Sequence, residues 1–215
     1  LWKFDEVVLD FKPDIVISIR DPWSDNWIIN SPYRKHFKYI HMPTCDGEPQ
    51  KAEWLEFYKQ CDKILTYSHW AKAILEKSTG GQIQVFDVAS AGPDLDVFKP
   101  RDKKPIRNGF GLPDDLFIAG TVMRNQPRKL FPEMFQAFSK FLAICKENKQ
   151  DDLAKKAFLH IHTSNPDVGW DIPTELRRYK ISHKVLFTYI CHACHNVAVS
   201  TYEGDVAVCK RCKNK

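Results

Sequence analysis

Short apolar runs alternate with stripes of apolar residues at helical spacing along most of the chain. Stretches typical of strands occur at residues 14–19, 37–40, 63–67, 82–88, 116–122, 157–163 and 184–189, and the continuous apolar run at 14–19 is typical of a parallel strand buried on both faces. Apolar residues recur every three or four positions at residues 2–11, 51–60, 69–77 and 130–142, as in amphipathic helices. This alternation predicts an α/β protein with a parallel, doubly wound sheet.

Capping residues mark the start of two predicted helices. Ser68 precedes a helical stripe, at a position where a Ser side chain accepts a backbone hydrogen bond. Asp171 and Pro173 stand where a second, shorter helix would begin, with Pro in its first turn. Gly80 and Gly81 follow the first of these helices and favour the left-handed backbone that ends a helix. We therefore expect helices to begin just after Ser68 and Asp171.

A basic loop separates an apolar run from a helical stripe in the second half of the chain. The loop at residues 123–129 carries Arg124, Arg128 and Lys129. Ligands of open α/β sheets bind at the carboxyl ends of strands, and a helix amino end adds N–H groups and a positive dipole. The loop therefore suits a phosphate group, while a solvated surface loop is the plain alternative.

The same stretch resembles a known family. Gly120-Thr121-Val122, then Arg124 and Lys129, then a helix with Ala137-Phe138 resemble the start of the donor-binding domain of family 4 glycosyltransferases, which are retaining enzymes of the GT-B fold. The resemblance implies that Arg124 and Lys129 hold the diphosphate of a nucleotide-sugar donor, a UDP- or GDP-sugar, and that no catalytic metal is needed. Leu130 stands where the family usually has Gly, so the start of this helix is expected to differ.

Two loops in the first hundred residues match the family by position. His41 follows the run 37–40, and the resemblance implies that its loop borders the catalytic cleft. His41 would then contact the donor sugar or the acceptor hydroxyl, with Asp46 as a weaker catalytic candidate. A satisfied His beside an Asp-Gly turn is the alternative. Residues 90–100 resemble the signature that ends the family's first domain, which makes Gly92 and Asp94 candidates for lining the cleft.

The most specific motif is a double pair of cysteines. Cys191 and Cys194 form one C-x2-C pair, and Cys209 and Cys212 form another after fourteen intervening residues. Four thiolates in this arrangement can surround Zn²⁺ and leave no open position, so the metal is expected to be structural. Residues 197–199 and 206–208 are apolar and flank a Gly-Asp turn, which predicts the hairpin of a zinc ribbon. Two disulfides, an iron–sulfur centre or free thiols are the alternatives.

A pair of histidines is a weaker candidate for metal binding. His160 and His162 lie two residues apart in the run 157–163, so they share a face of the expected strand. No third ligand is evident nearby in the sequence. A buried or edge position is therefore the better interpretation.

These features define the expected domains. Residues 1–100 belong to an amino-terminal Rossmann-like domain on the acceptor side, 101–107 form a linker, 108–190 begin a donor-binding Rossmann-like domain, and 191–215 are a truncated zinc-ribbon insertion. Both GT-B type domains are expected to be incomplete, because the chain lacks an initial Met and the family's Gly-rich donor-ribose motif with two Glu residues. The chain is thus expected to be an internal piece of a longer enzyme, which can be inactive on its own.

Composition narrows the setting and the partners. The net charge of +5 is modest and has no run of five like charges, so it suits an anionic ligand as well as nucleic acid. The sequence has no stretch of eighteen consecutive apolar residues, so a membrane span is not expected. The first residues do not resemble a secretion signal. Clustered cysteines indicate metal rather than a disulfide framework, so a reducing cytoplasm is the simplest setting.

The resemblance therefore predicts a retaining glycosyltransferase of the hexosyltransferase class. It would move a sugar from a nucleotide-sugar to an unknown acceptor, which is a glycan, lipid, protein or small molecule. The alternative is a non-catalytic zinc-ribbon module on an α/β scaffold that binds nucleic acid or a protein partner. A nucleotide-sugar epimerase-like protein is a third interpretation, weakened by the lack of a Gly-rich loop after a strand.

Overall fold

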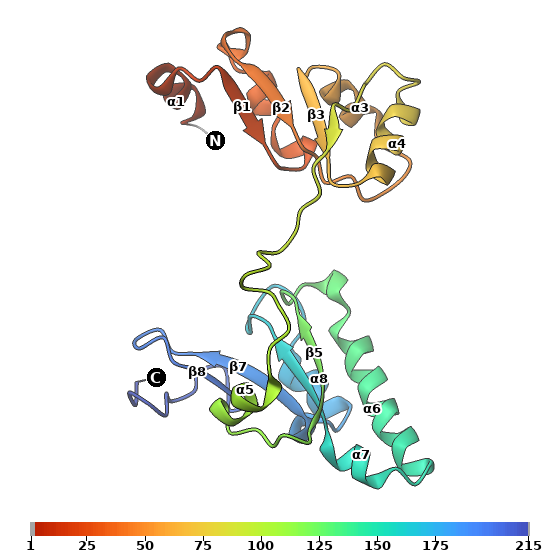
Figure 1. The fold of residues 1–215 in the computed structure, drawn as a ribbon, viewed down its shortest axis with the longest axis vertical. Helices are drawn as coiled ribbons and strands as arrows, with labels where there is room; N and C mark the ends of the chain where they lie inside the picture. The colour runs from red at the N-terminus through yellow and green to blue at the C-terminus, as the bar shows by residue number, and fades with distance from the viewer. Residues whose placement is uncertain (1–2, 215) are drawn as a thin grey trace. The chain divides into compact units, whose positions relative to one another are not determined.

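The computed structural model describes residues 3–214, so Leu1, Trp2 and Lys215 lie outside the described residues. The chain divides into two compact units, Leu1–Lys99 and Pro100–Lys215. Each unit contains a four-stranded, mostly parallel sheet and its own hydrophobic core (Figure 1). The chain is an α/β protein, as the alternation of strands and helices predicts.

The sheet of the first unit is parallel and has the order β1-β2-β3-β4. Its strands are β1 (Ile15–Ser18), β2 (Lys38–His41), β3 (Lys63–Thr66) and β4 (Asp87–Val88). The helices are α1 (Phe4–Phe11), α2 (Asn26–Ile29), α3 (Ala52–Tyr58) and α4 (His69–Ser78), with 3₁₀ helices η1 (Pro22–Ser24) and η2 (Arg34–His36). Ser68 caps α4 as predicted, because its side chain accepts a hydrogen bond from Ala71 N at 3.2 Å.

Only one face of this sheet is well buried in the described residues. Tyr39 and His41 of β2 are fully buried and lie on the same face as Val16 of β1. On the opposite face, Ile15 and Ile17 are 54% and 61% exposed. The expectation that this apolar run is buried on both faces is therefore wrong for β1, because no described helix covers its outer face.

The sheet of the second unit has the order β5-β6-β7-β8, with the first three strands parallel. Its strands are β5 (Phe117–Val122), β6 (Ala157–His162), β7 (Val185–Ile190) and β8 (Val197–Thr201). The helices are α5 (Lys103–Gly109), α6 (Phe131–Glu147), α7 (Asp151–Lys156) and α8 (Ile172–Arg178), with 3₁₀ helices η3 (Pro127–Lys129) and η4 (Ser182–Lys184). Pro173 lies in the first turn of α8 as predicted, and Asp171 caps the helix, since its side chain accepts a hydrogen bond from Thr174 N at 3.1 Å.

The long helix α6 supplies the core that holds this sheet in place. Phe131, Phe135 and Phe138 recur at helical spacing and are buried against β6, β7 and α8. β5 lies at the edge of the sheet, and its Phe117 and Val122 are 49% and 79% exposed. The expectation of a buried strand at residues 116–122 is therefore wrong, because an edge strand has a neighbour on one side only.

The segment expected to be a linker, residues 101–107, is largely helical. Asp102 caps α5, and its side chain accepts a hydrogen bond from Lys104 N at 3.1 Å. Ile106 and Phe110 line a small cavity together with Leu186 of β7. Helix α5 therefore belongs to the second unit and lies against the sheet face opposite α6.

The apolar segment before the second cysteine pair does not form the expected ribbon hairpin. Residues 197–199 lie in β8, which pairs antiparallel with β7 and so extends the main sheet. Residues 206–208 form no strand, and Val206 is 70% exposed. Pairing with β7 satisfies the backbone of β8 within an existing sheet, so the segment 197–201 is part of the second unit rather than of a separate insertion.

Candidate functional sites

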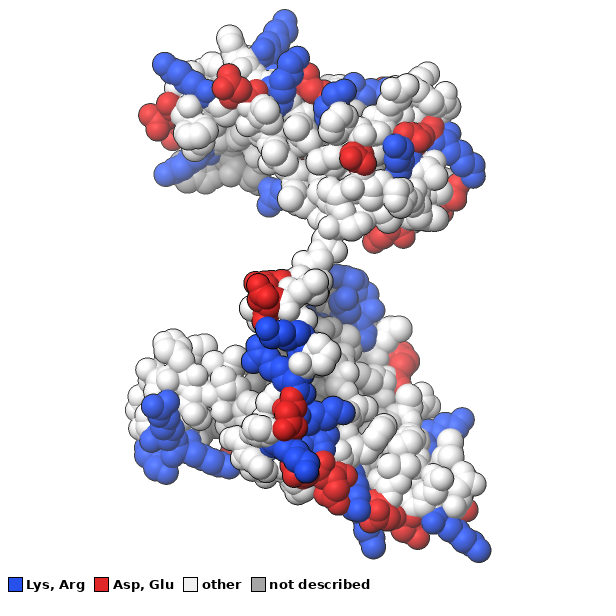
Figure 2. Space-filling view, viewed as in Figure 1, with Lys and Arg blue, Asp and Glu red and all other residues white. Residues whose placement is uncertain are grey.

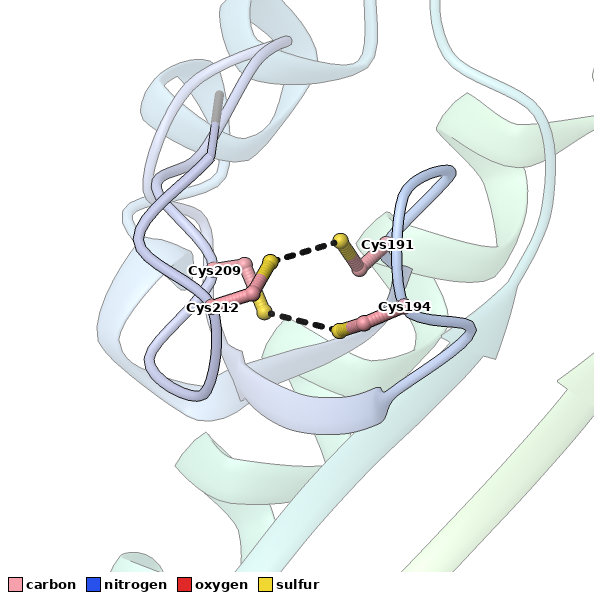
Figure 3. Close-up of side chains that lie close together, drawn as sticks. All are labelled: Cys191, Cys194, Cys209 and Cys212. Atoms are coloured by element: carbon pink, nitrogen blue, oxygen red, sulfur yellow. Dashed lines mark hydrogen bonds between the residues drawn. The ribbon is translucent and has the colours of Figure 1, made fainter.

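Four cysteines converge beside the carboxyl end of β7. Cys191 follows β7 directly and Cys194 lies in the short loop before β8, while Cys209 and Cys212 come from the end of the described chain (Figure 3). Their sulfur atoms all lie within 4.8 Å of one another. Cys191 Sγ is 3.5 Å from Cys212 Sγ, and Cys194 Sγ is 3.7 Å from Cys209 Sγ. The sequence thus correctly predicts which cysteines assemble.

The two cysteine pairs share one backbone geometry. The N–H of His195 bonds the carbonyl of Cys191 at 2.9 Å, and the N–H of Lys213 bonds that of Cys209 at 2.9 Å. His195 and Lys213 both have positive φ, 55° and 63°. In each pair the loop therefore turns back on its first cysteine in the same way, which aims backbone N–H groups at the sulfur.

Those N–H groups favour thiolates. The N–H groups of Cys212 and Arg211 lower the pKa of the Cys209 thiol to about 6. The N–H groups of Cys194 and Ala193 lower the pKa of Cys191 in the same way. At Cys194 the Asn196 N–H lowers the pKa, but burial and the neighbouring sulfurs outweigh it and raise the pKa to about 12, so the lowered pKa values provide two of the deprotonated sulfurs that a metal ion requires.

The sulfur spacing fits a metal better than disulfides. Sulfurs at the corners of a tetrahedron around Zn²⁺ lie about 3.8 Å apart, given Zn–S bonds of about 2.3 Å. A disulfide would need about 2.05 Å, and all the described cysteines are free. The four cysteines can therefore hold a metal ion such as Zn²⁺, with four protein ligands and no open position for chemistry.

A cavity of 640 Å³ opens at the carboxyl edge of the second sheet. It is lined by the ends of three parallel strands and by the loops that follow them, including Val122, Arg124, His162, Asn165, Tyr189, His192, Tyr202 and Asp205. Loops at this edge are where open α/β sheets bind ligands. The cavity is thus the natural candidate for a ligand site in this unit.

Arg124 reaches this cavity from the loop after β5 and is held by Asp167. Its Nε and Nη2 donate to the two carboxylate oxygens of Asp167 at 2.8 and 3.0 Å. The Asp167 side chain is 8% exposed and the Arg124 side chain 60%. This pairing holds the pKa of the Asp167 carboxyl well below its usual range. The guanidinium is therefore oriented by its buried partner while its Nη1 end stays available to a second group.

Lys129, the other predicted phosphate ligand, does not line this cavity. It lies in η3, where its N–H bonds the carbonyl of Gln126 at 2.9 Å. Leu130 follows with a φ of 52°, and α6 then begins at Phe131 with Pro132, which has no N–H to offer. The left-handed residue Leu130 and Pro132 in the first turn leave the start of α6 with fewer free N–H groups than a regular helix start.

A buried clamp below Arg124 escapes sequence analysis. Asn125 is fully buried; its Nδ2 donates to Trp170 O at 2.8 Å, and its Oδ1 accepts from Trp170 N at 2.9 Å. A Cβ at Gly169 would overlap Asn125 Oδ1 and lie 2.7 Å from the Asn125 carbonyl carbon. Gly169 is therefore required for this close approach. An isolated Gly beside a Trp is the only sequence signal of the clamp.

His41 lies inside the first unit instead of at an open surface. It is fully buried, with Nδ1 2.9 Å from Tyr39 Oη. Tyr39 donates to Asp25 Oδ2 at 3.2 Å, and Ser18 Oγ also donates to this oxygen. Because the Tyr39 proton goes to Asp25, His41 Nδ1–H donates to Tyr39, and among the described residues His41 Nε2 has no partner.

Burial changes the acid–base behaviour of His41. Desolvation lowers its pKa to about 4, and the nearby Asp25 carboxylate offsets only part of that. The ring is therefore neutral near pH 7. The sequence does not reveal this buried network, because Asp25 is 16 positions away from His41 along the chain and lies within a polar loop.

The remaining predicted site residues lie on exposed loops of the first unit. Asp46 is exposed, whereas His41 is buried, so the structure does not present them to a common open surface. Asp94 accepts a hydrogen bond from Asp96 N at 2.9 Å within a turn, and Gly92 lies in an exposed loop before it. The structure gives Asp94 a turn-forming role and shows no contact for Gly92 that indicates a ligand.

The predicted histidine pair behaves as a structural feature. His160 Nε2 lies 2.9 Å from Thr188 Oγ1 of the neighbouring strand, and His162 is exposed at the cavity edge. Among the described residues, the only group of three or more potential ligands close enough to hold a metal is the cysteine cluster.

Comparison with known proteins does not identify the chain, because no protein-family model and no curated protein matches it. In the part of the chain that the structure describes, every helix is too short or too polar to cross a membrane.

Proposed function

We propose that the second unit binds the diphosphate of a nucleotide-sugar and that the chain is part of a retaining, GT-B type glycosyltransferase. The observation that carries the proposal is the placement of Arg124. It lies at the carboxyl edge of a parallel sheet, borders a cavity of 640 Å³, and is oriented by Asp167 so that one end of its guanidinium stays available.

This placement suits the chemistry of a leaving diphosphate. Sugar transfer from a nucleotide-sugar builds negative charge on the diphosphate as the glycosidic bond breaks. A fixed guanidinium stabilises that charge more in the transition state than in the ground state, because it is oriented beforehand and needs no reorganisation. Lys129 adds a positive charge in the same loop, where it favours binding at longer range.

In this proposal the first unit forms the acceptor side of the enzyme. His41 has a neutral ring with an unpartnered Nε2 and so can accept a hydrogen bond from a hydroxyl group. Its burial means that it acts only if the surrounding side chains move. The zinc ion would be structural, because four cysteines leave no open position on it.

Nucleotide binding tests the proposal directly. Calorimetric titration of the zinc-loaded chain with UDP and with GDP should show saturable binding of one of them. Arg124→Ala should weaken that binding at least about tenfold, because it removes charge-assisted hydrogen bonds. Lys140→Ala, which removes an exposed cation on α6, is the matched control and should bind like wild type. Absence of binding to both nucleotides would overturn the proposal.

A second candidate function comes from the basic end of the cysteine cluster. Lys210, Arg211 and Lys213 are exposed beside the second pair, and Figure 2 shows Lys and Arg side chains gathered near the end of the chain. A zinc module that binds nucleic acid would use these cations on phosphates. Its affinity would fall steeply with salt and would depend on Arg211 but not on Arg124.

A further inference from the structure

The segment between β8 and the second cysteine pair forms one wall of the cavity. Residues 202–208 have no helix or strand, and Val206 and Val208 are 70% and 49% exposed. Tyr202, Gly204 and Asp205 nevertheless line the cavity. Apart from Tyr202, whose ring centroid lies 5.5 Å from that of Phe187 in the core, little apolar burial holds this segment, so its position depends on a few polar contacts and on the cysteines at its end.

Tyr189 at the end of β7 provides the first anchor for this segment. Its hydroxyl accepts a hydrogen bond from Glu203 N at 2.8 Å and donates to Gly204 O at 3.3 Å. Cys191, the first cysteine of the cluster, follows only two residues later. The same strand end thus holds both the segment and the metal site.

Asp205 provides the second anchor and joins the segment to the loop after β6. Its Oδ1 accepts hydrogen bonds from Asn165 Nδ2 at 2.8 Å and from Tyr202 Oη at 2.5 Å. Two residues after Asn165 in that loop, Asp167 holds Arg124 and also accepts from Ser164 Oγ at 2.6 Å. The loop 163–168 therefore contacts both the segment 202–208, through Asn165, and the guanidinium of Arg124, through Asp167.

We propose that the metal in the four-cysteine site controls the affinity of this cavity for its ligand through Asp205. The metal fixes the far end of the segment 202–208 at Cys209, and the segment in turn holds the loop 163–168 that orients Arg124. The identity of the ligand, a nucleoside diphosphate, rests on the proposed function. The mechanical link between the two sites does not depend on it.

The physical reason lies in the thiols. With a metal, four thiolates share one cation and the two pairs are held together. Without it, the four described cysteines are joined across the two pairs only by sulfur–sulfur contacts of 3.5 and 3.7 Å, which are far weaker than metal–thiolate bonds. The second pair then separates from the first, Asp205 loses its fixed position, and the cavity loses a wall. Coupling of this kind is reciprocal, so ligand binding also raises metal affinity.

Hydrogen–deuterium exchange on the full chain tests the link without any nucleotide. Removing the metal with a chelator under reducing conditions should speed exchange in residues 202–208 and also in 163–168, where Val168 N bonds Asp167. Asp205→Ala should bind Zn²⁺ with the wild-type stoichiometry, yet its loop 163–168 should exchange at a rate that no longer responds to metal. Asp152→Ala, at an exposed position on α7, is the matched control and should behave as wild type.

Titration with UDP and GDP then tests the consequence. Metal removal should weaken nucleotide binding about tenfold in wild type, and Asp205→Ala should show the weaker affinity even when loaded. Exchange in 163–168 that is unaffected by metal, or equally affected in Asp205→Ala, would overturn the inference. If the exchange results hold while neither nucleotide binds, the link between sites stands and the proposed function fails. If metal removal unfolds the unit, the loaded Asp205→Ala variant still decides the question.

Discussion

His41 and Arg124 both lie at the carboxyl end of a parallel strand, one in each unit, but they have opposite surroundings. His41 ends β2, which lies between β1 and β3 and is covered by Phe57 and Tyr58 of α3. Arg124 follows β5, the edge strand of its sheet, and its side chain is 60% exposed. One polar group is enclosed in a hydrogen-bonded network, and the other is held by a single carboxylate at the border of a cavity.

The difference shows that a position at the carboxyl end of a parallel strand does not by itself expose a side chain to ligands. Both residues lie at the carboxyl edge of a parallel sheet, where ligands usually bind. An interior strand brings covering side chains from both neighbours, whereas an edge strand leaves its loop open on one side. The unit with the open loop is therefore the better candidate for binding a ligand directly, and the enclosed network of the first unit contributes chiefly to stability at neutral pH.

The largest expected effect concerns the enclosed site and pH. His41 has a pKa of about 4 in the folded state, below its usual value of 6.5, so the unfolded chain binds its proton first. The stabilisation is complete above pH 6.5 and is lost as the pH falls from 6.5 to 4, by up to about 3 kcal/mol. Exchange of the β2 amide protons between pH 7 and 4 should report this loss in the first unit.

The non-titrating variant His41→Gln isolates this effect. It should lose most of the pH dependence in the β2 amides while it retains a side chain that can hydrogen-bond Tyr39. An identical pH dependence in wild type and His41→Gln would show that His41 is not neutral and buried in the folded state. The contrast between an enclosed His41 and an open Arg124 would then be wrong.

The next effect concerns the open site and its support. In Gly169→Ala the new Cβ would overlap Asn125, so the backbone below Arg124 must shift, at a cost of about 2 kcal/mol. The variant should lower the unfolding temperature of the second unit and weaken nucleotide binding together. Gly109→Ala is the matched control, since a Cβ there meets no atom within 4 Å. Equal unfolding temperatures for the two variants would contradict the role of the clamp.

Local signals explain which of these features the sequence predicts. Ser68 caps α4 and Pro173 lies in the first turn of α8 as expected, because both signals depend on residues within one turn. The cysteine cluster is likewise encoded in two short motifs. The pairing of Arg124 with Asp167 spans 43 positions, and the burial of His41 depends on α3 packing over β2. Such contacts are set by tertiary packing, which leaves no mark on local spacing.

The smallest effect tests the backbone at the open site. Leu130 has a φ of 52°, a left-handed conformation that costs a residue with a side chain about 1 kcal/mol relative to Gly. Its side chain is 52% exposed, so removing it loses little packing. Leu130→Gly should therefore raise the stability of the second unit by about 0.5 kcal/mol, as measured by urea unfolding.

Lys140→Gly provides the contrast, because position 140 is exposed within α6 and has ordinary helical backbone. There Gly should destabilise the unit by about 1 kcal/mol. If both variants destabilise the unit, the left-handed turn at Leu130 is not strained. If the two changes in stability differ in sign as expected, the loop that carries Arg124 ends in a backbone conformation that is unfavourable for Leu130. The backbone strain at Leu130 then lies next to the open site, where a ligand would approach, and the packing of α6 in the core offsets its free energy.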